Sequence, residues 1–330
     1  MLPPVATILT IGFALVTLIA PCRPGHITWP PATAFACDAL PPIFVNYWSF
    51  GNPSPEKAHG NWARSLYNYG DTETRRHGDT ESGKVSALRT LILSDIHSNL
   101  EALTAVIDDA KQRGGFDSVW CLGDIVGYGP DPGPCIKLLR QHKALAVAGN
   151  HDYVAVGKAS AADFNYAAKA AIEWTASNLS PEDIKYLSGL PTVVTVEPFT
   201  MVHGTLRDHL NEYLLERETA LATLELLKTR YCAVGHSHLP FICREDGGTS
   251  TFIEFAEDQA YALGDERLII NPGCVGQPRD RNPRPSYAIY DNQASSIERH
   301  RVDYRIQDTQ EKMRDAHMPE YLIERLNHGI

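Results

Sequence analysis

Five short polar clusters, each directly after an apolar run, contain the residues of this sequence that could carry out chemistry. They are Asp95-Ile96-His97, Gly123-Asp124, Gly149-Asn150-His151-Asp152, His203-Gly204 and Gly235-His236-Ser237-His238. Together they supply three aspartates, one asparagine and five histidines. Carboxylate oxygens and neutral imidazole nitrogens suit Mn, Fe, Zn or Co. If the clusters meet, they fit a pair of divalent metal ions. Such a pair chiefly serves phosphoryl chemistry, because it can hold both the attacking and the leaving oxygens.

The apolar run before each cluster has the length and composition of a buried strand. These runs are residues 90–94, 119–122, 144–148, 200–202 and 231–234. Short apolar runs bounded by glycine or polar residues predict interior strands. Because ligands bind beyond the carboxyl ends of strands in layered α/β sheets, the five clusters should meet at one edge. The glycines at 123, 149, 204 and 235 suit sharp turns where the backbone passes close to a ligand.

Helices are expected between and after these strands. From Leu100 the apolar residues recur on one helical face, which predicts an amphipathic helix packed on a sheet, with Asn99 as its cap. Further helices are predicted at 161–178, 216–229, 308–316 and 319–328, with Pro319 in the first turn of the last. Beyond residue 239 the sequence predicts short strands at 241–243, 251–253, 268–270 and 287–290.

The ordered motifs D-x-H, G-D, G-N-H-D, H-G and G-H-x-H resemble those of the calcineurin-like metallophosphoesterase superfamily. The segments SDIHSNLEAL at 94–103, CLGDIVGYGPDP at 121–132 and INPGCVGQPRD at 270–280 are similar to its small prokaryotic phosphodiesterase branch. The likeness covers roughly residues 89–310. It implies an α/β (α+β) fold, a four-layer α/β/β/α sandwich of two packed mixed β-sheets with a dinuclear metal site at one end.

The resemblance also implies a role for each motif residue. One metal ion would be held by Asp95, His97 and His238. The other would be held by Asn150, His203 and His236, with Asp124 as the bridge between the two. A water shared by the metals would become hydroxide near neutral pH and attack phosphorus. His151 would be the acid that protonates the leaving oxygen or stabilises the transition state, and Asp152 would orient its ring.

Contacts to the substrate are expected from Asn150, Tyr128 and Arg279, and alternatives remain open for several site residues. Arg279 follows the Asn271-Pro272-Gly273 turn and could bind a substrate phosphate, or it could be a solvated surface arginine. Tyr128 could pack on a base or ring of the substrate, or it could stabilise its turn. His151 could be only a structural cap, and Asp152 only a turn residue.

The segment after Asp124 narrows the expected substrate. Protein serine/threonine phosphatases and symmetrical dinucleoside tetraphosphatases carry an arginine shortly after the Gly-Asp motif, usually as GDxVDRG, whereas residues 123–129 contain none. We therefore expect hydrolysis of small phosphodiesters and negligible activity on folded phosphoproteins. A phosphomonoesterase or a protein phosphatase-like hydrolase is the alternative within the superfamily, and a non-catalytic metal-binding scaffold is the alternative of another class. Manganese is the expected metal, with Fe, Zn, Co or Ni as alternatives.

Charge limits the partners of this chain. Its 330 residues carry 30 Lys and Arg against 40 Asp and Glu, a formal net charge of −10. An acidic protein without a basic patch is not expected to bind long nucleic acid tightly, because that affinity comes mainly from neutralising phosphates. The expected partner is a small-molecule phosphoester. The sequence supports no firm membrane assignment and leaves the oligomeric state unknown.

Residues 1–88 differ from the rest, and we expect the metallophosphoesterase domain to span 89–330, with C-terminal helices from about 308. The apolar run from Val5 to Ala20 is too short for a clear transmembrane helix and lacks a preceding positive charge. Ala34-Phe35-Ala36 resembles a cleavage site, and the mixture at 51–84 predicts disorder. The segment is a mis-started leader, a signal or membrane anchor, or a functional part of the protein. Catalysis should not depend on it.

The seven cysteines indicate a reducing compartment. Their number is odd and their spacing forms no disulfide framework, so we expect free thiols and a cytoplasmic enzyme. If the apolar leader is genuine, the alternative is an exported or membrane-anchored protein.

Overall fold

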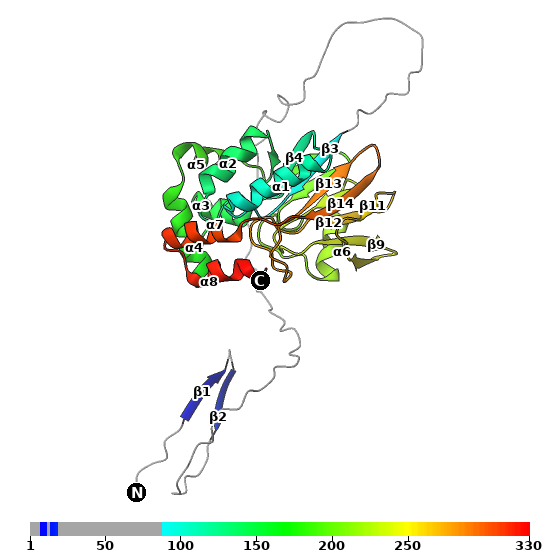
Figure 1. Cartoon of the computed structure of the whole chain (residues 1–330). Coiled ribbons are helices and arrows are strands. Elements are labelled where there is room, and N and C mark those ends of the chain that lie inside the picture. Colours follow the sequence, from blue (N-terminus) through cyan, green and yellow to red (C-terminus); the bar gives the residue numbers. More distant parts are fainter. Residues whose placement is uncertain (1–6, 12–13, 19–87) are drawn as a thin grey trace, which may run out of the picture. The chain divides into compact units, whose positions relative to one another are not determined.

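The computed structural model describes residues 7–11, 14–18 and 88–330, and the chain divides into two units, Met1–Gly78 and Asp79–Ile330. In the first unit, β1 (Thr7–Ile11) and β2 (Ala14–Leu18) pair in antiparallel fashion (Figure 1). The expected cleavage site at 34–36 and the expected disorder of 51–84 lie outside the described residues. Within the described ranges, no helix is both long enough and apolar enough to cross a membrane.

The second unit is built on two six-stranded mixed sheets. The first sheet has the order β11-β14-β13-β3-β4-β5. Its strands are β3 (Arg89–Leu93), β4 (Ser118–Cys121), β5 (Leu145–Ala146), β11 (Ala260–Ala262), β13 (Ser286–Asp291) and β14 (Ser296–Arg301). The strands β3, β4 and β5 are parallel to one another, whereas β13, β14 and β11 continue the sheet with antiparallel pairings.

The second sheet has the order β10-β9-β12-β8-β7-β6. Its strands are β6 (Val193–Val196), β7 (Phe199–Val202), β8 (Tyr231–Ala233), β9 (Phe241–Asp246), β10 (Thr249–Ile253) and β12 (Leu268–Asn271). The pairs β7–β8 and β8–β12 are parallel, and the outer pairings are antiparallel. Each sheet therefore contains three neighbouring parallel strands, and the loops that follow β3, β4, β5, β7 and β8 carry the predicted ligands.

Successive side chains along a strand pack into different layers of the fold. In β3, Leu91 and Leu93 pack with the helices on the outer face, whereas Ile92 packs with Trp120 and with Phe199 of the other sheet. Successive side chains of a strand point to opposite faces, so both faces of this strand are apolar because both are covered. A third cluster joins the outer face of the second sheet to α6 (Arg217–Leu226) through Leu224 and neighbouring residues.

The helices complete a four-layer sandwich. The remaining helices are α1 (Leu100–Gln112), α2 (Pro132–Gln141), α3 (Asn150–Ala155), α4 (Tyr166–Asn178), α5 (Pro181–Ser188), α7 (Ile306–Asp315) and α8 (Glu320–Glu324), with a 3₁₀ turn at Arg325–Asn327. Figure 1 shows α2–α5, α7 and α8 gathered on one side of the sheets and α6 on the other. The predicted α/β/β/α order, with two packed mixed sheets, is confirmed.

Most of the predicted elements are present, with several different boundaries. The α1 helix begins at Leu100 with its Asn99 cap, whose side chain accepts the N–H of Ala102 at 3.1 Å. The helix predicted from 161 begins only at Tyr166, because Asn165 caps its first turn. The helix predicted at 216–229 ends at Leu226. The predicted helix at 319–328 ends at Glu324, and Pro319 occupies its cap position and not its first turn.

Candidate metal centre

The loops that follow the parallel strands of both sheets bring the predicted ligands together. Asp95 and His97 follow β3, Asp124 follows β4, Asn150 and His151 open α3 after β5, His203 follows β7, and His236 and His238 follow β8. Parallel strands end at the same edge of a sheet, and in this fold the corresponding edges of the two packed sheets lie next to each other. Residues more than 140 positions apart are thereby in contact, as His97 and His238 show.

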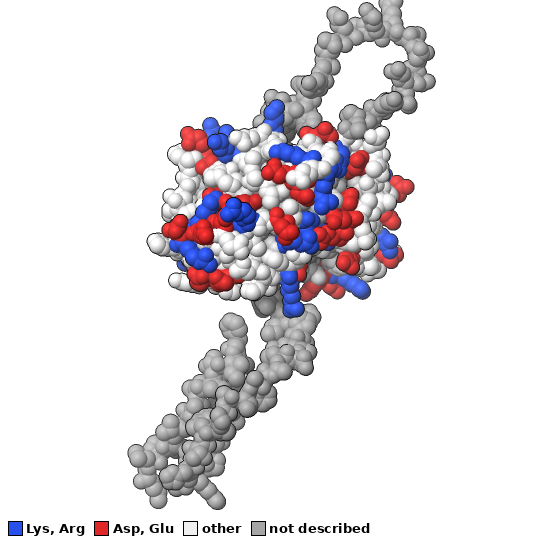
Figure 2. All heavy atoms as spheres, in the orientation of Figure 1, with Lys and Arg blue, Asp and Glu red and all other residues white. Residues whose placement is uncertain are grey.

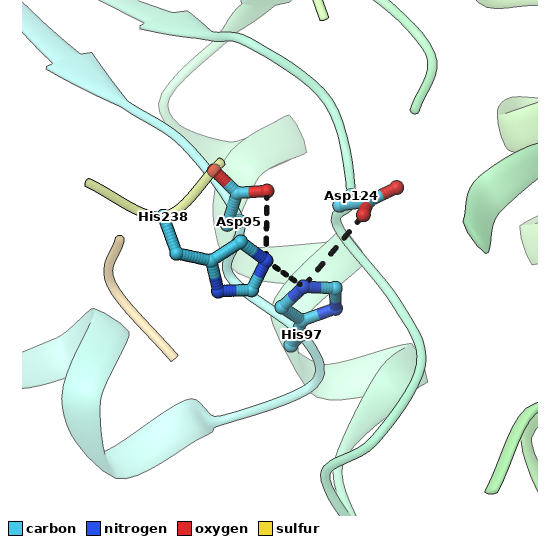
Figure 3. A group of neighbouring side chains, drawn as sticks. All are labelled: Asp95, His97, Asp124 and His238. Atoms are coloured by element: carbon cyan, nitrogen blue, oxygen red, sulfur yellow. Dashed lines mark hydrogen bonds and ion pairs between the residues drawn. The ribbon is translucent and has the colours of Figure 1, made fainter. Parts of the chain in front are cut away.

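The first set of ligand atoms comes from Asp95, His97, Asp124 and His238, which lie within 4.8 Å of one another (Figure 3). His97 Nε2 lies 3.2 Å from His238 Nε2 and 3.6 Å from Asp124 Oδ2. His238 Nε2 lies 3.4 Å from Asp95 Oδ1. Two imidazole nitrogens and two carboxylates thus converge on one point, an arrangement that suits a divalent cation.

A second set of ligand atoms shares Asp124 with the first. It consists of Asp124, His203 and His236. His203 Nε2 lies 3.4 Å from Asp124 Oδ2 and 3.1 Å from His236 Nδ1. The side-chain oxygen of Asn150 lies 3.2 Å from the same His203 nitrogen. The Oδ2 atom of Asp124 therefore faces both sets, which is the position that a bridging carboxylate would occupy.

Backbone carbonyls hold the outward-facing nitrogen of each histidine in the two sets. The Nδ1–H groups of His97, His203 and His238 donate to the carbonyls of Val126, Leu122 and Gln277 at 3.1, 2.7 and 2.7 Å. His236 uses the opposite nitrogen, and its Nε2–H donates to Asn211 at 3.1 Å. Such bonds fix the tautomer and aim the remaining nitrogen of each ring at the centre, as is usual for histidines that bind metals.

Burial keeps most of these imidazoles neutral, as metal ligands must be. It lowers the pKa of His97 and His238 well below the ordinary value, and it lowers the pKa of His236 to about 3. Burial raises the pKa of Asp95 to about 7, and neither oxygen of this fully buried carboxyl has a hydrogen-bond partner among the described residues. A buried carboxylate without a hydrogen bond is costly, so Asp95 fits a bound cation.

Asp124 and His203 form the charged pair of the centre. Although burial alone would raise the pKa of Asp124, the charges of His203 and His151 hold it well below its usual range. Although burial opposes the charged form of His203, Asp124 raises the pKa of this histidine to about 9. A cation that binds here would therefore displace the His203 proton. This donor set, with one carboxylate between two groups of imidazoles, fits two divalent cations.

The backbone at the ligands is strained. Asp95, His97, Asp124, His236 and His238 all have φ between 48° and 63°. Residues other than glycine uncommonly adopt this left-handed conformation, although aspartate and histidine do so more often than most. A close approach adds to the constraint, because a Cβ at Gly149 would overlap the backbone and carboxylate of Asp124. The loops thus hold the ligands in a fixed and unfavourable geometry that points them inward.

His151 lies beside the ligand sets, and one of its ring nitrogens has no hydrogen-bond partner among the described residues. Its backbone N–H donates to Asp124 Oδ1 at 2.9 Å. The ring is only 5% exposed, and its centroid lies 4.6 Å from that of Tyr128, 4.6 Å from that of Phe164 and 4.9 Å from that of His97. Its Nδ1 is buried against Gly127 and has no hydrogen-bond partner among the described residues. Burial lowers the pKa of His151 to about 4.

The Asp152 carboxylate binds the backbone. Its Oδ1 accepts the N–H groups of Ile125 at 2.9 Å and Val126 at 3.1 Å, and its Oδ2 accepts that of Gly149 at 2.9 Å. These contacts differ from the predicted one with the His151 ring. Asp152 instead ties the loop after Asp124 to the first turn of α3, and so it fixes the position of His151 through the backbone.

Tyr128 and Arg279 form one wall of the site, and two aromatic residues join them that the sequence had not indicated. Tyr128 is buried among residues of α4, α7 and α8, and its hydroxyl lies 3.5 Å from Arg279 Nη2. Phe164 packs on His151, and Tyr213 stacks on His236 with ring centroids 3.9 Å apart. Neither aromatic belongs to a motif, and only the fold brings them to the centre.

Comparison with known proteins supports the family resemblance that the sequence motifs indicate. Residues 88–295 match the calcineurin-like phosphoesterase superfamily domain. An uncharacterized protein of Methanocaldococcus jannaschii is 40% identical over 244 residues, which are 71% of this chain and 96% of that protein. A metallophosphoesterase from Sphaerobacter thermophilus is 42% identical in its crystal structure, and the match covers 74% of this chain and all of that chain with a TM-score of 0.68.

A more distant relative shares the fold. A hypothetical protein from Pyrococcus horikoshii OT3 is 18% identical, with 73% of this chain and 98% of that chain covered and a TM-score of 0.61. The layered fold, the two sets of ligand atoms and the family match over most of the described domain all indicate the same family. The chain therefore belongs to the calcineurin-like phosphoesterase superfamily and is a phosphoric ester hydrolase.

Proposed function

We propose that this protein hydrolyses small phosphodiesters at a two-metal centre. The observation that carries the proposal is the sharing of Asp124 Oδ2 between two sets of ligand atoms. Asp95, His97 and His238 would hold one cation, and Asn150, His203 and His236 the other. Two such cations supply Lewis-acid activation of water and neutralise charge on the phosphate. Manganese is the proposed metal, with Fe, Zn, Co and Ni as the alternatives to test.

His151 is the proposed acid. Because its Nδ1 is enclosed beside Gly127 and finds no acceptor among the described residues, the neutral ring should carry its proton on Nε2. From the neutral ring that nitrogen would donate a hydrogen bond that stabilises the charge developing on the leaving oxygen, whereas only the doubly protonated, cationic ring would transfer its proton to that oxygen and return to the neutral form. Asp152 supports this position indirectly, through the backbone bonds that fix the start of α3.

The burial of the centre supports a small substrate. Asp95, Asp124 and His151 are each at most 5% exposed, so a phosphate on a folded protein surface would reach them poorly. On the face in Figure 2, Lys and Arg alternate with Asp and Glu over the described domain, with no continuous basic band. This mixed surface supports a small-molecule phosphoester and not long nucleic acid as the partner.

One observation favours a second candidate, a phosphomonoesterase. The sequence has no arginine at 123–129, but Arg279 reaches the same wall from another loop and lies beside Tyr128. A monoester dianion gains more from a nearby guanidinium than a diester monoanion does. Whether this protein prefers diesters or monoesters therefore depends on whether Arg279 contacts the phosphate of the substrate.

The cytoplasm is the proposed compartment. The five cysteines of the described domain are all free and buried, as expected for a protein of a reducing environment. Burial raises the pKa of the Cys121 and Cys232 thiols, so these side chains act as small apolar core residues.

The decisive experiment measures metal content and turnover of the same preparation. The full chain would be loaded with Mn, Fe, Zn, Co or Ni and assayed on bis(p-nitrophenyl) phosphate, p-nitrophenyl phosphate, cyclic nucleotides and a phosphoserine peptide. We expect two metals per chain and a higher kcat/KM for the diesters than for the matched monoester. A preparation that dephosphorylates the peptide efficiently and leaves the diesters untouched would overturn the proposed substrate class.

A further inference from the structure

The ring of His151 lacks the backbone contact that orients the ligand histidines. The Nδ1–H groups of His97, His203 and His238 each donate to a backbone carbonyl. The Nδ1 of His151 is also buried but has no hydrogen-bond partner among the described residues. Its backbone N–H donates to Asp124 Oδ1 at 2.9 Å, but this bond does not fix the rotation of the side chain. The orientation of the His151 ring therefore has to come from packing.

Three aromatic rings and a glycine enclose this imidazole. Its centroid lies 4.6 Å from that of Tyr128 at an interplanar angle of 43°, and 4.6 Å from that of Phe164 at 40°. The ring of His97 meets it at 4.9 Å and 78°. A Cβ at Gly127 would overlap the Nδ1 atom, so the backbone of the loop after β4 passes close to it. Tilted and edge contacts of this kind are favourable between aromatic rings.

Phe164 differs from the other two aromatic neighbours because it comes from a separate part of the chain. His97 follows β3 and Tyr128 belongs to the loop after β4, so both are placed by the sheet that carries the proposed ligands. Phe164 lies in the connection between α3 and α4, outside the five polar clusters. The Phe164 contact can therefore be changed without altering a proposed ligand or the loop of the proposed bridging carboxylate.

The position of Phe164 is itself well defined. Its N–H donates to the Ala161 carbonyl at 3.1 Å, and the next residue, Asn165, caps α4 by accepting the N–H of Ala168 at 2.9 Å. The Phe164 side chain packs against two apolar clusters, one with residues of α1, α2 and α3 and one with residues of α4, α7 and α8. A ring held between two such clusters is a rigid support for the imidazole.

We propose that Phe164 is a positioning residue, whose ring holds the His151 imidazole in the orientation that leaves Nε2 for the leaving oxygen. Phe164 acts through His151 and is not one of the reacting groups. Without the flat face of the Phe164 ring the imidazole can rotate, and a displacement of about 1 Å is enough to cost roughly 10²-fold in rate. The inference rests on the proposed function for the role of His151, whereas the orientation of the ring can be measured without turnover.

The test compares variants at Phe164 with a matched control. Phe164→Leu keeps an apolar side chain but removes the flat ring, and Phe164→Tyr restores the ring. Phe164→Met, with a flexible apolar side chain, replaces the leucine variant if thermal unfolding shows that it does not fold. Tyr166→Leu is the control, because it also removes an aromatic ring but at a position that is 86% exposed. His151→Ala and the Phe164→Leu/His151→Ala double variant measure the coupling of the two side chains.

Two measurements are made on each full-length protein after it has been loaded with Mn and its metal content determined. The first gives kcat and KM for diphenyl phosphate and bis(p-nitrophenyl) phosphate, two aryl diesters that differ in their leaving group. The second follows acylation of His151 by diethyl pyrocarbonate, mapped by mass spectrometry and expressed relative to His317. His317 is exposed and therefore serves as the internal reference.

We expect both metals to be retained in every variant. Phe164→Leu should lower kcat for diphenyl phosphate by about 10-fold to 100-fold and change KM little, with a smaller loss for the nitrophenyl diester. The same variant should raise the relative acylation of His151 several-fold, because the ring is released from its packing. Phe164→Tyr should recover most of the rate, and Tyr166→Leu should behave as the unaltered chain does. In the His151→Ala background, Phe164→Leu should have almost no further effect.

Three results would overturn the proposal. They are unchanged rates and unchanged His151 acylation in Phe164→Leu, an equal loss of rate for both diesters, and an undiminished effect of Phe164→Leu in the His151→Ala background. Failure of the proposed function would look different. The unaltered protein would then hydrolyse neither diester, while Phe164→Leu would still raise the relative acylation of His151.

Discussion

The Asp124 carboxylate accepts the backbone N–H of His151 through Oδ1 at 2.9 Å, while its Oδ2 faces the ring nitrogens of His97 and His203. One side chain therefore links the proposed metal bridge to the first turn of α3, which carries the proposed acid. Any change that moves this carboxylate should alter metal binding and the position of His151 together.

Replacement of Asp124 should abolish the centre. In Asp124→Ala the shared oxygen and its charge are lost, and two cations about 3.5–4 Å apart would repel each other without it. We expect loss of at least one metal and nearly all turnover, measured by elemental analysis and a diester assay. Asp108→Ala, at an exposed α1 position paired with Lys111, is the matched control. Full occupancy together with full activity in Asp124→Ala would contradict the dinuclear assignment.

Replacement of His151 should separate the acid from the ligands. His151→Ala should keep both metals and lose rate by about 10²–10⁴-fold, the usual contribution of a general acid. The deficit should be smaller for nitrophenolate esters, because a good leaving group needs little protonation. Kinetics on esters with leaving groups of graded pKa would measure this. If the variant lost metal instead, His151 would be a ligand and the proposed role would be wrong.

Replacement of Asp152 should test its backbone role. In Asp152→Asn the amide nitrogen takes the place of an oxygen that accepts an N–H of Gly149, Ile125 or Val126. We expect a loss of about 1–3 kcal/mol in the free energy of unfolding, because a buried donor is left without its acceptor. Denaturant titration would measure the loss, and an unchanged stability with only a kinetic defect would argue for direct action on the His151 ring.

Metal affinity should fall as the pH falls. In the metal-free site Asp124 raises the pKa of His203 to about 9, and burial raises the pKa of Asp95 to about 7. Both groups must be deprotonated to bind a cation, so His203 releases a proton on binding below pH 9 and Asp95 releases another below pH 7. Calorimetry in two buffers of different ionisation enthalpy should detect at least one proton released at pH 7. An affinity that is constant from pH 6 to 8 would contradict this.

Truncation should test the domain boundary at residue 88. The β3 strand begins at Arg89, and the backbone N–H of Leu88 donates to the side chain of Asn292 at 2.7 Å. A chain that starts near Val85 keeps both features. We expect it to fold, bind metal and turn over as the full chain does, as judged by thermal unfolding and the diester assay. Insolubility of the shorter chain, beside a sound full-length protein, would show that residues 1–84 belong to the fold.

The sequence predicts that the proposed ligand side chains meet, because each of them comes directly after a strand. Asp95 and His238 could be expected at one edge from their local pattern alone. The sequence does not predict β14, because Arg299 and Arg301 interrupt its apolar pattern. The fold buries both, with Arg299 hydrogen-bonded to Phe255 and Arg301 paired with Asp280. Such compensation depends on residues that are distant in the sequence.

The orientation of the side chains in the site could not be predicted either, because it also depends on residues that are distant in the sequence. The Gln277 carbonyl that aims His238 lies 39 residues away, and its position depends on the loop after β12. Tyr213 stacks on His236, although no motif or spacing in the sequence indicates this contact. The backbone contacts of Asp152 could not be predicted either, because a carboxylate beside a histidine suggests a ring contact, whereas in the fold three backbone N–H groups donate to its oxygens.

The left-handed backbone at five ligand positions has a consequence for how this protein can change. Such residues cost on the order of 1–3 kcal/mol each, and glycine adopts the same conformation without that cost. A substitution such as His238→Gly would therefore relieve local strain while it removes a ligand. The relief applies to the backbone alone, because loss of the buried ring also leaves a cavity and removes the donor of the Gln277 carbonyl.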